Sequence, residues 1–249
     1  MKIFKEYQPI EDQLFQIMDN DGKIINPGWK PDLDEKAVLK AYKDMLFART
    51  GDLMTVSYQR QGRIYTYPPN YGQEAISKAA GMLMRDQDWL VPAFRELGAY
   101  VAKGASLKEL FLYSMGNEIG SRFENAKNFL PSSVPIASQL LHAAGIGYAV
   151  KYRNEDSVVF TFVGDGGTSQ GDFHEALNFA SVWKAPVLFM VQNNQYAISV
   201  PFQKQTASKN VAIKAMSYGM EGIKVDGNDF FAMYKAIQES VEYIKNGNG

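Results

Sequence analysis

Two short motifs in the middle of the chain carry side chains that could bind a metal ion and a phosphate group. Asp165 lies between two glycines in Gly164-Asp165-Gly166, and Asn193-Asn194 follows further along the chain. A carboxylate oxygen and an amide oxygen are ligands that Mg²⁺ accepts when it holds a diphosphate. Glycines let the main chain approach a ligand closely, and the start of a helix favours phosphate. The predicted chemistry is therefore magnesium-assisted binding of a diphosphate group.

The segments around these motifs predict how they are brought together. Apolar runs at 158–163 and 187–192 are typical of buried strands, and each run ends at one motif. Between them, residues 172–183 place apolar side chains at helical spacing. A strand, a helix and a strand in this order predict a parallel pair, whose carboxyl ends meet at one edge of the sheet. Ligands of open α/β sheets bind at that edge.

The rest of the pattern predicts an α/β fold, a mostly parallel sheet flanked by helices. Residues 1–33 contain several prolines and read as an N-terminal arm with one hairpin, and residues 34–249 read as the α/β domain. Asp34 is predicted to cap the first long helix. The other expected elements are helices at 34–61, 72–85, 95–103, 106–115, 138–151, 208–218 and 229–246, a loop at 195–207 and a strand at 222–226.

Composition excludes several classes of function. The chain of 249 residues has a formal net charge of −1, so it has no basic footprint for nucleic acid. It contains no cysteine, which excludes disulfides and thiolate catalysis. Charged residues interrupt the first residues too early for a signal peptide, and no apolar run is long enough to span a membrane. The expected location is the cytoplasm.

The spacing of the two motifs resembles the signature of thiamine-diphosphate enzymes. Across residues 164–206 the chain is similar to the α subunit of the E1 component of 2-oxo acid dehydrogenase complexes, closest to the bacterial pyruvate dehydrogenase type. The similarity includes Asn70-Tyr71-Gly72-Gln73-Glu74-Ala75, residues 93–96, residues 132–139 and Val225-Asp226-Gly227-Asn228-Asp229. It therefore covers nearly everything after about residue 40.

The resemblance implies a metal site and a phosphate cradle. Asp165 would supply a carboxylate oxygen to Mg²⁺, Asn194 its side-chain oxygen and Tyr196 its main-chain carbonyl. Because Tyr196 would act through its main chain, it should tolerate substitution better than the other two. Main-chain N–H groups of the turn would face the phosphates. The turn is formed by Gly164, Gly166 and Gly167.

Further cofactor contacts are implied upstream of the metal site. Arg95 matches the diphosphate-binding arginine of the family, and Phe94 stands where many relatives have tyrosine, so a hydroxyl contact is lost there. Ile136 lies at the position that supports the bent cofactor, and main-chain groups at Val134 and Ile136 could bind the aminopyrimidine. A branched residue before an apolar helix is equally consistent with plain core packing.

Other polar residues of the sequence have competing interpretations. One loop resembles a potassium site in some relatives, although such oxygen-rich segments more often cap helices. For His142 and His174, a role as an ordinary helix residue is favoured over acid–base catalysis. The potassium-like residues are Ser133, Pro135, Ser138 and Gln139.

The family resemblance also implies a reaction and partners. Thiamine diphosphate would serve the decarboxylation of a 2-oxo acid, pyruvate by the nearest resemblance, and the acyl group would pass to a lipoyl group on an E2 acyltransferase. The glutamate that activates the cofactor comes from a separate β subunit, so an α₂β₂ assembly is expected. Relatives continue into a loop that carries a histidine, whereas this sequence ends at Gly249. The chain is therefore expected to be C-terminally truncated, with one sheet edge uncovered and catalytic competence in doubt.

Three alternatives remain open from the sequence. An NAD-binding oxidoreductase would use the glycine turn, but the turn lacks the G-x-G-x-x-G spacing and no acidic residue ends the next strand. A truncated, non-catalytic assembly partner would keep the fold alone. Acetoin dehydrogenase and branched-chain 2-oxo acid dehydrogenase α subunits share the same motifs, so the substrate is undecided between pyruvate, acetoin and a branched-chain 2-oxo acid.

Overall fold

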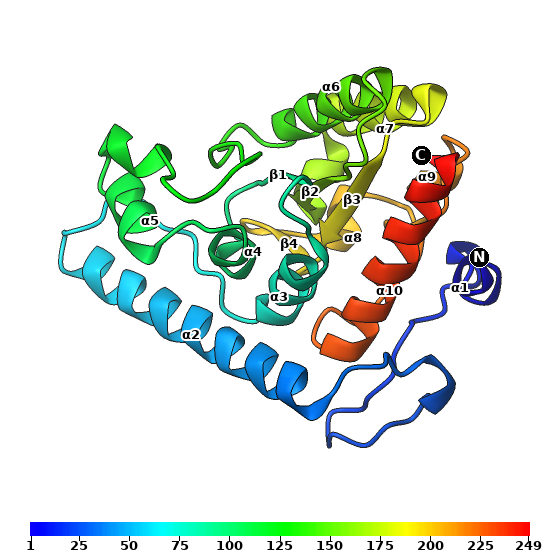
Figure 1. Cartoon of the computed structure of the whole chain (residues 1–249), viewed down its shortest axis with the longest axis horizontal. Helices are drawn as coiled ribbons and strands as arrows, with labels where there is room; N and C mark the ends of the chain where they lie inside the picture. Colours follow the sequence, from blue (N-terminus) through cyan, green and yellow to red (C-terminus); the bar gives the residue numbers. More distant parts are fainter.

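A parallel sheet lies at the centre of the molecule, as the sequence predicted. The computed structural model describes residues 1–249, and its main sheet has three strands in the order β1-β2-β3 (Figure 1). Both pairings are parallel. The strands are β1 (Trp89–Val91), β2 (Val159–Gly164) and β3 (Val187–Gln192). The carboxyl ends of β2 and β3, which carry the two motifs, therefore meet at one edge.

Helices cover both faces of this sheet. Successive side chains of β2 point to opposite faces, so Phe160 and Phe162 join one core cluster while Val159 and Val163 join another. The first cluster includes residues of α3 (Glu74–Leu83), α4 (Leu97–Ala102) and α10 (Phe230–Tyr243). The second includes residues of α6 (Ser138–Tyr152) and α7 (Gly171–Trp183). This two-sided burial explains why the strands read as nearly continuous apolar runs.

Small residues bring α6 close to the sheet. Ala143, Ala144 and Gly147 are buried on the inner side of this helix. A Cβ atom added at Gly147 would lie 2.5 Å from Cγ2 of Val187 on β3. The close packing holds the segment before α6 near the carboxyl edge of the strands, where the first turn of that helix contributes to the candidate site.

A long outer helix, α2 (Glu35–Arg60), packs against α3 and α4. Its start confirms the predicted cap, because Oδ1 of Asp34 accepts a hydrogen bond of 2.6 Å from the main-chain N–H of Ala37. Ion pairs join α2 to α3: Arg49 Nε lies 2.5 Å from Glu74 Oε1, and Lys78 Nζ lies 2.6 Å from an oxygen of Asp44. The shorter helix α5 (Leu107–Ser114) begins with a capping box, and η3 (Glu118–Ser121) follows it.

The N-terminal 33 residues are packed against the end of the domain. They form α1 (Lys2–Glu6), η1 (Pro9–Glu11) and η2 (Pro27–Trp29), with an antiparallel bridge between Met18 and Ile24 where a hairpin was expected. Figure 1 shows α1 beside α10. Apolar arm residues form a core cluster with Ala232 and Ala236 of α10. These are Ile3, Phe4, Phe15, Ile17 and Trp29.

Four predicted elements differ in the structure. Residues 195–207, predicted as a loop, form β4 (Tyr196–Ala197), β5 (Val200–Pro201) and α8 (Phe202–Gln205). The helix predicted at 208–218 is limited to α9 (Ile213–Met216) because Asn210 bonds to the arm: its Nδ2 donates to Pro9 O at 2.9 Å, while its Oδ1 accepts from Ile213 N. An asparagine used in this way starts a helix rather than continuing one.

The strand predicted at 222–226 is also absent. The main chain of residues 222–226 makes one parallel bridge, between Val225 and Phe15 of the arm, and does not join the central sheet. Strand β3 accordingly pairs only with β2 and forms one edge of the sheet. The last predicted helix is shorter than expected, since α10 ends at Tyr243 and continues as a π-helical turn, η5 (Ile244–Asn248).

Candidate functional site

The Asp165 turn lies at the carboxyl end of β2 and leads into α7. Asp165 begins the 3-10 turn η4 (Asp165–Ser169), and only 1% of its surface is exposed. Its Oδ2 accepts a hydrogen bond of 3.0 Å from Nε2 of Gln205, on α8. Nothing else in the structure pairs with this carboxylate through a side chain. A buried carboxylate that faces a neutral amide is well suited to a cation, because it has no ion-pair partner to exchange.

Hydrogen bonds from Thr168 and Lys214 stabilise the Asp165 turn. Thr168 Oγ1 donates to the main-chain oxygen of Asp165 at 2.8 Å, and Lys214 Nζ donates to Thr168 O at 2.8 Å. Burial lowers the pKa of Lys214 below its usual value, and no carboxylate lies within ion-pair distance of it. A cation placed behind the turn favours negative charge in front of it.

The glycines of the turn are required by close packing. A Cβ atom at Gly166 would lie 2.6 Å from Cβ of Ala197 on β4, and one at Gly167 would overlap the side chain of Val163 and lie 3.5 Å from Cγ2 of Ile136. The first contact brings the loop after β3 against the turn after β2. The second brings Ile136, a predicted cofactor residue, to the same place.

Gly166→Ala should therefore push the β4–β5 hairpin away from the turn. We expect a loss of stability of about 1–3 kcal/mol, which is typical of overpacking, together with weaker binding of thiamine diphosphate by the assembled enzyme. Thermal unfolding and calorimetric titration measure the two effects. Gly171→Ala is the matched control, because the nearest atom to its added Cβ is Glu175 Oε1 at 4.0 Å. Equal effects of the two substitutions would contradict the packing argument.

The second motif forms consecutive turns after β3. Asn193 Oδ1 accepts from Gln195 N at 2.9 Å, and Asn194 Oδ1 accepts from Tyr196 N at 3.0 Å. Both asparagines are exposed, as is Tyr196. Residues Tyr196–Ala197 of β4 contact η4, so the two motifs meet as predicted, although no metal ligation by Asn194 or Tyr196 follows from these contacts alone.

Arg95 lies in the loop between β1 and α4. Its guanidinium donates to the main-chain oxygen of Pro69 at 2.8 Å and lies 6.0 Å from the ring centroid of Phe94. Arg95 makes no ion pair with a carboxylate, in contrast to Arg49 and Arg85. An unpaired guanidinium fixed by a carbonyl can still offer its other N–H groups to a phosphate.

The loop before α6 carries the remaining predicted residues. Val134 and Ile136 are 65% and 49% exposed, so the interpretation of Ile136 as plain core is wrong. Ser133 Oγ lies 2.8 Å from Ser138 Oγ, which in turn donates to Pro135 O at 3.0 Å. These oxygens cluster at the start of α6, whereas Gln139 points away and donates to Phe162 O at 2.7 Å.

The histidines take no part in this arrangement. His174 Nδ1 lies 2.6 Å from the hydroxyl of Tyr218, and its ring packs on Phe173. His142 makes no side-chain hydrogen bond and lies exposed on α6. The sequence interpretation of both as ordinary helix residues agrees with these contacts.

Sequence reasoning missed two residues next to the site. Gln205 bonds to Asp165, and Glu96 is fully buried beside Arg95, where burial raises the pKa of its carboxyl to about 7. The signal that could have indicated Glu96 is its place directly before the apolar segment 97–102, where an acidic side chain is unusual. No comparable signal marks Gln205, whose partner lies 40 positions away.

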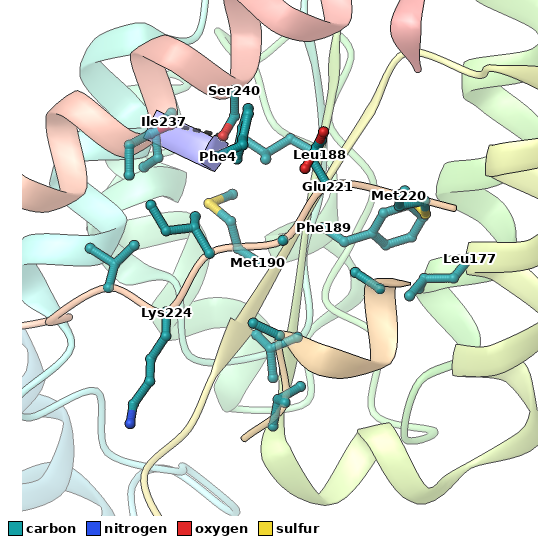
Figure 2. Close-up of a pocket in the computed structure, with 18 of the residues that line it drawn as sticks. Phe4, Leu177, Leu188, Phe189, Met190, Met220, Glu221, Lys224, Ile237 and Ser240 are labelled. Atoms are coloured by element: carbon teal, nitrogen blue, oxygen red, sulfur yellow. Dashed lines mark hydrogen bonds between the residues drawn. The ribbon is translucent and has the colours of Figure 1, made fainter. Parts of the chain in front are cut away.

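A cavity of about 320 Å³ lies elsewhere, between the free edge of β3, residues 220–225 and α10. Figure 2 shows Leu188, Phe189 and Met190 of β3 among its lining side chains, with Ile237 of α10. Of the 28 lining residues 20 are hydrophobic; Asn193 of the second motif is among them, but Asp165, Asn194 and Arg95 are not. An apolar cavity of this kind does not suit a diphosphate, so it is not the site that the motifs predict.

Comparison with known proteins shows the family of this chain. Residues 42–249 match the model of the family described as "Dehydrogenase E1 component". The chain belongs to the dehydrogenase E1 component family. This membership confirms the resemblance seen in the sequence and disfavours the NAD-binding alternative.

Relatives within the dehydrogenase E1 family are named as pyruvate dehydrogenase E1 component subunit alpha. The protein of this name from Acholeplasma laidlawii is 42% identical over 231 residues, which are 93% of this chain and 67% of that protein. The one from Staphylococcus epidermidis is 39% identical over 249 residues, all of this chain and 67% of that protein. The chain thus spans about two thirds of the length of these relatives.

Two further observations complete the comparison. A solved structure of a "thiamin diphosphate-dependent enzyme isolated from Mycobacterium smegmatis" is 17% identical, with a TM-score of 0.45 over 72% of this E1-family chain and 30% of that chain. None of the helices is both long and apolar enough to cross a lipid bilayer.

Proposed function

We propose that this chain is the α subunit of a 2-oxo acid dehydrogenase E1 component, which decarboxylates pyruvate and transfers the acyl group to the lipoyl group of an E2 acyltransferase. One observation carries the proposal: the Asp165 turn and the Asn193-Asn194 loop, far apart in sequence, pack together at one sheet edge through Gly166 and Ala197. The names of the relatives support pyruvate as the substrate.

The residues present fit a magnesium diphosphate group. Asp165 offers a buried carboxylate with only an amide partner, and Lys214 places a positive charge behind the same turn. Asn194 and the carbonyl of Tyr196 lie on the adjoining loop and would complete the protein ligands of Mg²⁺. Gly164, Gly166 and Gly167 would turn main-chain groups toward the phosphates, and Arg95 would bind them from the β1 side.

Thiamine diphosphate, when bound, supplies the electron sink for loss of CO₂ from a 2-oxo acid. The role of this chain is to bind and orient the diphosphate half. Val134 and Ile136 are exposed at the same edge and would contact the ring half of the cofactor, with the oxygens of Ser133 and Ser138 as candidates for a nearby potassium ion. A β subunit would supply the activating glutamate in an α₂β₂ assembly, and the cytoplasm is the proposed location.

The proposal is tested by substrate turnover in the assembled enzyme. The chain is coexpressed with an E1 β subunit, and the purified assembly is assayed with an artificial electron acceptor, thiamine diphosphate and Mg²⁺. We expect turnover of pyruvate to exceed that of acetoin and of a branched-chain 2-oxo acid. Faster turnover of one of these would change the substrate, and no turnover of any in a folded assembly that binds the β subunit would favour the assembly-partner alternative.

A further inference from the structure

The loops that carry the proposed cofactor contacts are joined by hydrogen bonds that the proposed function does not use. Residues 92–96 hold Phe94 and Arg95, and residues 131–137 hold Val134 and Ile136. The main-chain N–H of Ser133 donates to Ala93 O at 2.9 Å. Beneath this contact, the hydroxyl of Tyr100 lies 3.1 Å from Oγ of Ser132.

The chain of hydrogen bonds ends at Glu96. Its Oε2 accepts from the Tyr100 hydroxyl at 3.0 Å and from the main-chain N–H of Arg95 at 3.0 Å. A tyrosine hydroxyl has one proton to donate in a hydrogen bond. Because the Tyr100 hydroxyl donates to Glu96, the hydroxyl of Ser132 must be the donor in its contact with Tyr100. The direction of the chain is therefore from Ser132 through Tyr100 to Glu96.

Packing of the core does not by itself explain why an acidic side chain is buried at position 96. Its side chain is fully buried, it makes no ion pair, and its Oε1 has no hydrogen-bond partner. Burial raises the pKa of the carboxyl to about 7. A buried carboxyl with one free oxygen is unfavourable for folding, and its place beside Arg95 points to a role in the adjoining site.

The Glu96 carboxyl fixes the main chain of Arg95 by accepting a hydrogen bond from its N–H. The side chain of Arg95 is fixed separately, through Pro69 O. The residue after Pro69 is also anchored, since Asn70 N donates to Asp52 Oδ1 at 2.7 Å and Asn70 Oδ1 accepts from Leu97 N at 3.0 Å. The main chain of Arg95 is thus tied to a buried carboxyl, and its side chain is tied to the carbonyl that precedes the buried Asn70.

We propose that Glu96, Tyr100 and Ser132 are positioning residues that set the distance between Arg95 and the 131–137 loop. This inference rests on the proposed function, in which Arg95 binds the diphosphate half of the cofactor while Val134 and Ile136 contact its ring half. A ligand that spans both loops depends on their separation. A ligand that occupies only the Arg95 side does not depend on it.

The test compares two ligands in the α₂β₂ enzyme. Thiamine diphosphate and inorganic pyrophosphate, each with Mg²⁺, are titrated calorimetrically into the wild type, Tyr100→Phe, Ser132→Ala and the double variant. We expect each single variant to weaken thiamine diphosphate binding about 10-fold, the upper range for one hydrogen bond, and pyrophosphate binding less than about 3-fold. The double variant should resemble the singles, because both substitutions break the same chain of bonds.

Tyr234→Phe on α10 is the matched control, because it removes a phenolic oxygen for which the structure shows no hydrogen bond. Glu96→Gln, which keeps an acceptor oxygen, should bind thiamine diphosphate better than Glu96→Ala. If Tyr100→Phe misfolds, the partly exposed Ser132→Ala still decides the question. Equal weakening of both ligands, or no weakening of either, would overturn the positioning role. Failure of the wild type to bind thiamine diphosphate would instead count against the proposed function.

Discussion

Asp165→Ala is expected to abolish magnesium-dependent binding of thiamine diphosphate in the assembled enzyme. Asp165 is the only charged protein ligand proposed for the metal, and it is buried at the end of β2. Loss of a group that hydrogen-bonds to a metal ligand typically lowers metal affinity by about 10- to 100-fold. Removal of the ligand itself should therefore weaken binding by more than about 100-fold. Isothermal titration of the variant with the cofactor and Mg²⁺ measures the effect.

The matched control is Asp172→Ala, which removes a carboxylate in the first turn of α7, away from the closely packed glycines. Tyr196→Phe should also bind the cofactor normally, because only the main chain of Tyr196 is proposed as a ligand. An Asp165→Ala enzyme with unchanged affinity would remove the central claim of the proposed metal site. Thermal unfolding of each variant separates a binding defect from misfolding.

The isolated chain is expected to show no measurable decarboxylation of pyruvate, even with saturating thiamine diphosphate and Mg²⁺. The residues assigned here bind the diphosphate half, and the glutamate proposed to activate the cofactor belongs to the β subunit. Glu96 is the one buried glutamate near the site, but its Oε2 is engaged by Arg95 N and the Tyr100 hydroxyl. The assay measures CO₂ release or reduction of an artificial acceptor.

Addition of purified β subunit to the same sample should restore turnover, which serves as the positive control. The Glu96→Gln chain is a second check, because it should be as inactive alone as the wild type. Turnover by a chain shown by mass spectrometry to be free of β subunit would contradict the division of labour between the subunits. It would also make Glu96 the first residue to examine as an internal activator.

Several parts of the fold could be predicted from the sequence because their causes are local. The apolar runs 158–163 and 187–192 became β2 and β3, and the helix between them became α7 with nearly the predicted bounds. The cap at Asp34 depends on atoms three positions apart. The position of Asp165 and Asn194 at one edge follows from the parallel pairing of β2 and β3, which a strand–helix–strand pattern predicts.

Other features depend on segments that meet only in the folded chain. Val225 was expected in a strand at 222–226. The local pattern does not show that Lys224 O and Asp226 N form their hydrogen bonds with Phe15 of the arm. The helix expected at 208–218 is interrupted because Asn210 reaches Pro9, 201 positions away. Such competition between long-range and local hydrogen bonds overrides sequence propensity.

The sequence by itself determined the chemistry of the site: local periodicity placed a carboxylate, an amide and flexible glycines at two strand ends, and the family resemblance added an arginine. The tertiary structure alone decided how that chemistry is held. Gln205 reaches Asp165 from 40 positions away, and Tyr100 joins Glu96 to Ser132 across two loops. The physical reason is that hydrogen-bond partners and burial depend on three-dimensional packing, whereas strand and helix periods are written in neighbouring residues.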